Sequence, residues 1–123
     1  MKRKTLAAAT VLGLCAVWST QSSGGPRWLD QVALTEFYQA GFTVEHDEGW
    51  RLTSKADGSM TFTKGDYSDS GKWRIGGDRV CSRWRKIRDR VEACFRVAVE
   101  GDSYIWEKAD GSHDTAKITA RGE

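Results

Sequence analysis

The residues best suited to chemistry are arginines that alternate with other side chains around two cysteines. In an extended strand, side chains two residues apart point to the same face. Residues 79–85 and 93–100 show this alternation, and each places one cysteine on its arginine-bearing face. A guanidinium donates paired hydrogen bonds to phosphate or carboxylate groups. We therefore take as candidate anion-binding residues the arginines of this hairpin and of its basic connection 86–90: Arg79, Arg83, Arg85, Arg88 and Arg96.

The two cysteines of this hairpin, Cys81 and Cys94, are expected to form a disulfide. A third cysteine, Cys15, lies in the N-terminal segment that export is expected to remove, which leaves an even pair. In an oxidising compartment such a pair is most simply a disulfide, and closing this loop contributes roughly 3 kcal/mol. A metal or redox pair is the alternative, although the spacing is not C-x-x-C and no histidine is near.

The distribution of charge marks the same hairpin. The chain of 123 residues has a formal charge of +2, and residues 20–123 carry 16 basic and 17 acidic groups. Residues 72–96 hold nine basic and three acidic groups, whereas the rest of 20–123 has a balance of −7. The near-neutral total argues against nucleic acid. The local excess indicates an anionic glycan, lipid or protein partner, and the alternative is a solvated face whose arginines pair with acidic residues.

Catalytic patterns are weak by comparison. The sequence has no Gly-x-Ser-x-Gly elbow and no phosphate-binding loop. Carboxylates such as Asp66, Asp69 and Glu107 leave open a small hydrolase or transferase, which needs a cleft that gathers at least two of them. We favour binding over catalysis and expect neither a catalytic residue nor a cofactor.

The two histidines, His46 and His113, are each followed by an aspartate. Their spacing matches no standard zinc pattern, so we interpret both as exposed turn residues and expect no metal site. Residues 66–71 begin like a calcium-binding loop, but the twelfth position is Gly77 and not glutamate. We interpret this segment as a polar turn.

The N-terminus is typical of a secretory signal peptide. A basic start, residues 1–5, precedes a 13-residue apolar run, 6–18, which is shorter than the roughly 20 residues of a transmembrane helix. Cys15 follows Leu14, which is too large for a lipoprotein signal, and this argues against lipidation. We expect a signal peptide at 1–19, a linker at 20–27 and a single β-rich domain at 28–123; cleavage within 22–24 and a retained N-terminal anchor are the alternatives. The mature chain should contain no transmembrane segment and be periplasmic or secreted.

The remaining pattern predicts one helix followed by an antiparallel meander. Pro26 suits a first helical turn, Gly41 suits its end, and Thr35 is an alternative cap for a shorter helix 36–40. The face of this helix is predicted from its apolar spacing: Leu29, Val32, Ala33, Phe37 and Ala40. Strands separated by Gly/Asp turns are expected at 43–46, 50–54, 59–63, 71–75, 79–85, 93–100, 104–107 and 116–120. The expected fold is mainly β, an up-and-down barrel or strongly curved sheet with one short N-terminal helix.

Two further patterns concern the turns and the tryptophans. The string Lys-Ala-Asp-Gly-Ser occurs at 55–59 and at 108–112, which predicts two similar hairpin turns. Four tryptophans occupy strand positions, where core packing is favoured over a sugar-stacking platform: Trp50, Trp73, Trp84 and Trp106. A barrel interior that carries a small apolar ligand is a further alternative.

The order of short motifs resembles a family of small exported proteobacterial proteins that is known only as a domain of unknown function. The motifs are Leu34-Thr35-x-Phe37, Gly71-x-Trp73-x-Ile75, Val80-Cys81-x-x-Trp84, Cys94-Phe95-x-Val97 and Gly101-Asp102-x-Tyr104. The similarity covers the chain from about residue 30 onward. It implies an exported β-rich domain and transfers no catalytic residue. The density of arginines from 79 to 96 departs from the family pattern.

Overall fold

The computed structural model describes residues 25–122. The expected signal peptide, Cys15 and most of the expected linker lie outside these residues. The described elements are helix α1 (Gln31–Ala40), the short turn η2 (Ile87–Arg90) and strands β1 (Phe42–Glu45), β2 (Trp50–Ser54), β3 (Ser59–Lys64), β4 (Tyr67–Gly76), β5 (Arg79–Trp84), β6 (Ala93–Phe95), β7 (Val97–Glu100), β8 (Ser103–Glu107) and β9 (His113–Arg121).

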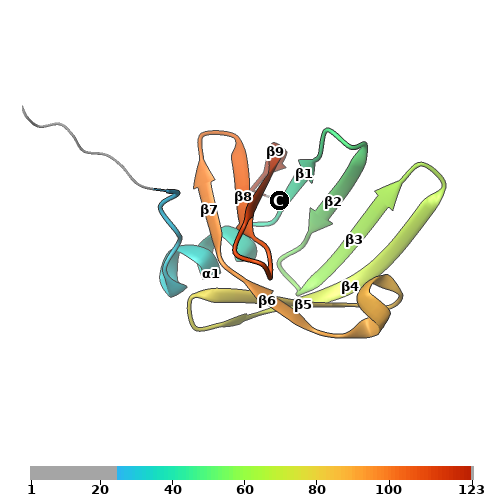
Figure 1. The fold of residues 1–123 in the computed structure, drawn as a ribbon, viewed down its shortest axis with the longest axis horizontal. Helices are drawn as coiled ribbons and strands as arrows, with labels where there is room; N and C mark the ends of the chain where they lie inside the picture. The colour runs from blue at the N-terminus through green and yellow to red at the C-terminus, as the bar shows by residue number, and fades with distance from the viewer. Residues whose placement is uncertain (1–24, 123) are drawn as a thin grey trace, which may run out of the picture.

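All nine strands belong to one antiparallel sheet in the order β6-β5-β4-β3-β2-β1-β9-β8-β7. Each hydrogen-bonded pair apart from β1 and β9 is also consecutive in the chain, so the topology is up-and-down. The sheet coils into a nearly closed barrel (Figure 1). The predicted fold class, mainly β with one short helix, is therefore confirmed.

The two edge strands of the sheet, β6 and β7, follow each other in the chain and are separated by a single residue, Arg96. The sequence predicted one strand over 93–100, but the first half pairs with β5 and the second half with β8. One segment therefore serves both edges of the sheet and is interrupted where it changes partner. The backbone carbonyl groups beside the interruption are hydrogen-bonded. Glu107 N–H donates to the Arg96 carbonyl at 3.1 Å, and Leu29 N–H donates to the Val97 carbonyl at 2.8 Å.

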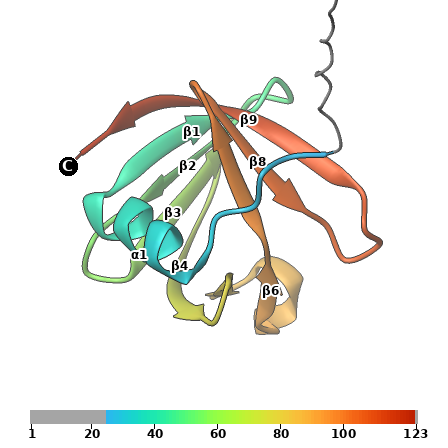
Figure 2. The ribbon, with the colours of Figure 1, turned by 90° about the vertical axis from the view of Figure 1, so that its left-hand side faces the viewer.

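Helix α1 lies across one end of the barrel (Figure 2). It begins after Asp30, whose carboxylate accepts the Ala33 N–H at 2.9 Å, so the predicted starts at Pro26 and Thr35 are both wrong. An aspartate in extended conformation is a strong N-cap because it satisfies a donor that the first turn leaves free. The predicted end at Gly41 is confirmed.

The predicted apolar face of the helix is only partly correct. Of its residues, Leu29 and Phe37 pack against the core. Leu34 and Tyr38 are buried, whereas Val32 is 67% exposed. The apolar spacing was ambiguous because two overlapping stripes exist, and the barrel end selects the one that carries Tyr38. Around this face the main core forms from the helix and strands: Leu34, Tyr38, Phe42, Val44, Val80, Val97, Tyr104, Ala116 and Ile118.

Two strands begin several residues before their predicted starts. Strand β4 begins at Tyr67 and β9 at His113. The interpretation of residues 66–71 as a polar turn is therefore wrong, because Tyr67 to Ser70 pair in register with β3. Polar side chains on an outward-facing strand do not prevent ladder pairing, which uses only backbone groups.

The disulfide and the two turns agree with expectation. Cys81 lies opposite Cys94 in the ladder, and the two sulfurs are bonded. In the two repeated turns, Asp57 accepts the N–H and hydroxyl of Ser59, and Asp110 does the same for Ser112, at 2.9 and 2.6 Å in both cases. Both predictions are confirmed.

Within residues 25–122, the helical part is too short and too polar to cross a bilayer.

Candidate anion-binding site

Strand β5 carries the predicted basic face with the predicted alternation. Val80, Ser82 and Trp84 are buried toward the barrel interior, whereas Arg79 and Arg83 are exposed. The disulfide lies on the same outer face as these arginines. The alternation therefore identified correctly which side chains leave the barrel.

Two of the five predicted arginines are paired with one carboxylate of β8. Arg96 binds both oxygens of Glu107, at 2.9 and 2.6 Å, and Arg79 lies 3.8 Å from the same group. The hydrogen bonds from Arg96 lower the pKa of Glu107. The Arg96 guanidinium also lies 4.8 Å from the ring centre of Trp28. Both arginines are thus engaged within the protein.

The other three predicted arginines separate into two groups. Arg88 is also exposed, but its Nη2 reaches the inward face of β5 and donates to the carbonyl and hydroxyl of Ser82 at 3.1 and 2.9 Å. Arg83 and Arg85 remain on the outer surface. Neither forms an ion pair with any residue of the described chain. The five predicted residues therefore do not form one site.

The connection after β5 is fixed by a buried carboxylate from β4. Asp69 is 6% exposed, and its oxygens accept the backbone N–H groups of Ser70, Lys86 and Ile87 at 2.9, 3.0 and 2.9 Å. Burial acts to raise the pKa of Asp69, but the three donors outweigh it and the pKa lies below its ordinary value. This contact sets the start of η2 and so the direction of the basic side chains that follow.

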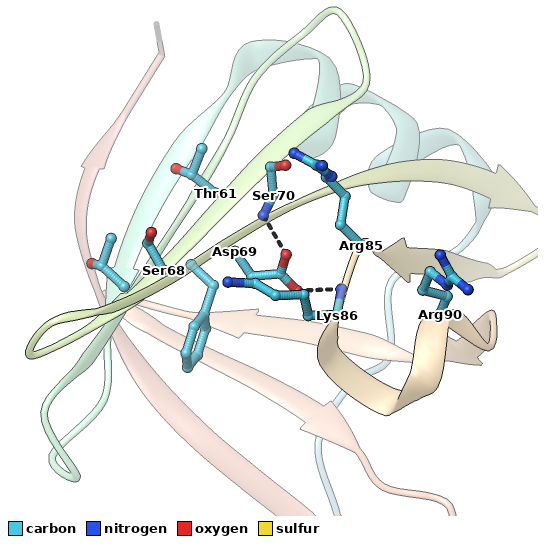
Figure 3. Close-up of a pocket in the computed structure, with 9 residues that line it drawn as sticks. Thr61, Ser68, Asp69, Ser70, Arg85, Lys86 and Arg90 are labelled. Carbon is cyan, nitrogen blue, oxygen red and sulfur yellow. Dashed lines mark hydrogen bonds between the residues drawn. The ribbon is translucent and has the colours of Figure 1, made fainter.

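A hollow of about 750 Å³ lies between this connection and strands β3 and β4. Figure 3 shows hydroxyl groups from the strands on one side and basic side chains from the connection on the other. The hydroxyl-bearing residues are Thr61, Thr63, Ser68 and Ser70, and the basic ones are Arg85, Lys86 and Arg90.

A second hollow of about 570 Å³ adjoins the first, because both include Arg85 and Arg90. It adds Lys72 and Arg83 from the paired strands β4 and β5, which are opposite each other in the ladder. We call the two hollows together the basic groove, and its cations are Lys72, Arg83, Arg85, Lys86 and Arg90. None of these five forms an ion pair with a residue in 25–122.

Two acidic residues line the basic groove. Asp69 is occupied by its backbone donors, and Asp89 lies on the exposed surface of η2. Five cations against two carboxylates leave the groove with a formal charge of +3. Such a surface attracts anions and has no internal counter-charge for most of its cations.

Sequence reasoning missed three members of this groove, Lys72, Lys86 and Arg90. Their signal was present, because residues 86–90 read as a basic connection and Lys72 opens the basic segment. Strand alternation does not apply to a connection, so it could not indicate which of these side chains share a surface. That placement depends on the contact between Asp69 and η2.

The carboxylates considered for hydrolysis are dispersed. Asp69 lines the groove with its oxygens already bonded, Glu107 pairs with Arg96, and Asp66 is an exposed turn residue. None of the hollows described in residues 25–122 is lined by two of the three.

The histidines have different surroundings. His46 is buried and stacks on Trp50, and its Nε2 lies 3.1 Å from Asp114, so its interpretation as an exposed turn residue is wrong. His113 is exposed, as predicted, but it begins strand β9 and does not lie in a turn, and its ring contacts Trp28. A metal-type cluster in the described chain comprises Glu92 and the two cysteines, whose sulfurs are joined to each other.

Comparisons with protein-family models, with curated proteins and with solved structures found no match for this chain.

Proposed function

We propose that this protein is an exported, non-enzymatic binding domain whose basic groove holds an anionic glycan of the cell envelope. The observation that carries the proposal is the set of five cations around two adjoining hollows, none of them in an ion pair with a described residue. The disulfide between Cys81 and Cys94 supports a periplasmic or secreted location, because disulfides persist in oxidising compartments.

A glycan suits the groove better than a simple ion because the groove is lined both by cationic side chains and by hydroxyl groups. Guanidinium groups bind carboxylate or phosphate substituents through paired hydrogen bonds. The threonine and serine hydroxyls of β3 and β4 donate and accept hydrogen bonds, as sugar hydroxyls do. Two hollows that share Arg85 and Arg90 can accept neighbouring charged units of one chain.

The binding measurement uses the protein purified after expression of the full-length sequence. Polygalacturonate serves as the anionic glycan, neutral dextran as the uncharged glycan, and vesicles with anionic lipid as the rival surface. We expect saturable binding of polygalacturonate that weakens as salt rises, because exposed charges are screened over roughly 8 Å at physiological ionic strength. Tighter binding to the vesicles than to the glycan would contradict the glycan assignment.

A charge-matched pair of variants locates the binding. Neutralising the groove with Arg85→Gln, Lys86→Gln and Arg90→Gln should weaken polygalacturonate binding about tenfold, since exposed charge pairs contribute roughly 0.5 kcal/mol each. The control variant neutralises three exposed cations outside the groove that, like those of the groove, form no ion pair within residues 25–122: Arg27→Gln, Lys55→Gln and Lys117→Gln. Equal weakening by both triple variants would show general charge attraction and refute a site in the groove.

A further inference from the structure

The barrel has an apolar interior that its own side chains do not fill. A cavity of about 410 Å³ extends from Tyr38 on α1 to η2 and the β8–β9 turn. This volume lies within the roughly 300–1,000 Å³ range of small-molecule sites. We call this cavity the lumen, and its large apolar lining residues include Trp50, Leu52, Phe62, Trp84, Phe95 and Trp106.

Several of these lining residues remain half-buried although they point into the barrel. Trp50, Phe62, Phe95 and Trp106 are in this intermediate class, whereas the residues of the main core beside α1 are almost fully buried. Protein interiors are normally packed as densely as organic crystals. The side chains at this end of the barrel therefore offer apolar surface to an occupant.

The inner end of the lumen is closed by a pair of hydroxyl groups. The oxygens of Tyr38 and Tyr104 lie 2.5 Å apart, and burial raises the pKa of both groups. The pair is neutral and each hydroxyl already has a partner. It therefore presents no charge to an apolar molecule that reaches this depth.

The outer end carries two cations that form no ion pair within residues 25–122, Arg88 and Lys108, and Arg88 is the one that hydrogen bonds hold in place. Arg88 lines the lumen and is held there by its bonds to Ser82, yet no carboxylate of residues 25–122 pairs with it. Partial burial lowers the pKa of this guanidinium, which nonetheless keeps its charge in proteins. Glu107 also lines the lumen but is paired with Arg96.

The backbone that aims Arg88 is strained. Arg88, Asp89 and Arg90 have φ angles of 56°, 53° and 67°, the left-handed region that non-glycine residues seldom occupy. The contact of Asp69 with Lys86 and Ile87 fixes the start of this turn. Such strain persists where surrounding contacts over-determine it, and it concentrates at ligand-binding sites.

We propose that the lumen binds a single-chain amphiphile, with its apolar chain among the tryptophans and its anionic head group against Arg88. The lumen shares only Phe62 and Trp84 with the lining of the basic groove, whose cations lie on the outer surface and are proposed to bind a polymeric anion. The head-group chemistry is shared by carboxylates and phosphate monoesters, and the apolar lining favours an unbranched hydrocarbon chain.

The first test measures affinity against chain length and head group. The protein, made from the full-length sequence, is stripped of bound lipid and titrated with decanoate, dodecanoate, dodecyl phosphate and dodecanol below their micelle concentrations, with tryptophan fluorescence as the readout. Each added methylene should strengthen binding about fourfold until the lumen is full. Dodecanoate or dodecyl phosphate should bind at least tenfold more tightly than dodecanol, and the tighter of the two identifies the head group.

The second test changes Arg88, the hydrogen-bonded cation at the outer end. Arg88→Gln should weaken dodecanoate binding about tenfold and leave dodecanol unchanged, and Arg88→Lys should recover part of the loss. Arg83→Gln is the matched control, because it removes the same charge from the outer face. If Arg88→Gln does not fold, the comparison of acid and alcohol with the unaltered protein still decides the role of a cation.

Two results would overturn this proposal. The first is an absence of saturable binding by any chain, and the second is that neither dodecanoate nor dodecyl phosphate binds more tightly than dodecanol. Polygalacturonate should not displace dodecanoate, and displacement would show that the two ligands share one site. Because dodecanoate binding does not involve Arg85, Lys86 or Arg90, the triple groove variant should retain it, so the two proposals can fail independently.

Discussion

At the scale of the residue, Asp69 holds the connection that carries several of the basic side chains. Its carboxylate is buried and accepts three backbone N–H groups, two of them from the connection that carries the basic side chains. A carboxylate in this position substitutes for the backbone partners that a tight, irregular connection lacks. Asp69 thus acts by positioning, although the sequence suggested it as a catalytic group.

The first prediction concerns the pH dependence of this contact. The pKa of Asp69 is lower in the folded protein than the ordinary value of about 3.9. Its stabilising contribution is therefore complete above that ordinary value and is lost as the pH falls through the folded pKa. Asp69→Asn should lower the urea midpoint at pH 7 and lower it less at pH 3, which is below the ordinary value. Asp66→Asn, at an exposed turn residue nearby, should change neither midpoint. Equal effects of Asp69→Asn at both pH values would contradict this account.

At the scale of the element, strand β4 fits closely against β5 at one glycine. A Cβ atom at Gly71 would lie 2.6 Å from the Arg83 carbonyl oxygen and 2.8 Å from the Trp84 ring. The indole of Trp84 therefore packs directly on the backbone of the neighbouring strand. This contact also places Arg83 and Arg85, on either side of Trp84, toward the outer surface.

The second prediction tests this close approach. Gly71→Ala should lower the free energy of unfolding by about 1–3 kcal/mol, because a backbone atom and a large ring must both move. The control is Gly76→Ala in the same strand, where the nearest atoms are 3.4 Å or more away and belong to side chains. Urea unfolding followed by tryptophan fluorescence measures both. Similar losses in the two variants would refute a specific role for Gly71.

At the scale of the whole molecule, the barrel closes where the two edge strands of its sheet are joined by the chain. Strands β6 and β7 are the two edges of the sheet, and the chain passes from one to the other through Arg96. Strand β6 is only three residues long, and the disulfide ties it to β5. The disulfide therefore secures the least extensive part of the ladder.

The third prediction concerns that disulfide. Replacing Cys81 and Cys94 with alanine should lower the free energy of unfolding by about 2–4 kcal/mol, because the unfolded chain regains the freedom of the loop. In urea unfolding, reductant should lower the free energy of unfolding of the unaltered protein by the same amount as the double substitution does. Reductant should have no effect on the double variant. Intact mass with and without reductant identifies the bonded state. If the urea midpoint of the unaltered protein is the same with and without reductant, the prediction is contradicted.

The local sequence pattern was sufficient to predict most strands and turns of the fold. Alternation identified which residues of β5 face outward, and the Gly/Asp turns separated most strands correctly. It did not find the start of β4, because polar residues on an outward strand resemble a turn. It also misplaced the helix start, because Pro26 and Thr35 both suit a start and the capping contact of Asp30 with the Ala33 N–H was not recognised.

The sequence by itself determined the strand periodicity, the cysteine pair and the concentration of basic residues between 72 and 96. Tertiary structure alone decided which cations stay unpaired, since Glu107 reaches Arg79 and Arg96 only after β8 and β7 are joined in the ladder. It also created the lumen, which depends on how far the sheet coils. Alternation depends on a strand's own backbone, whereas ion pairs and cavities depend on elements that are distant in the sequence.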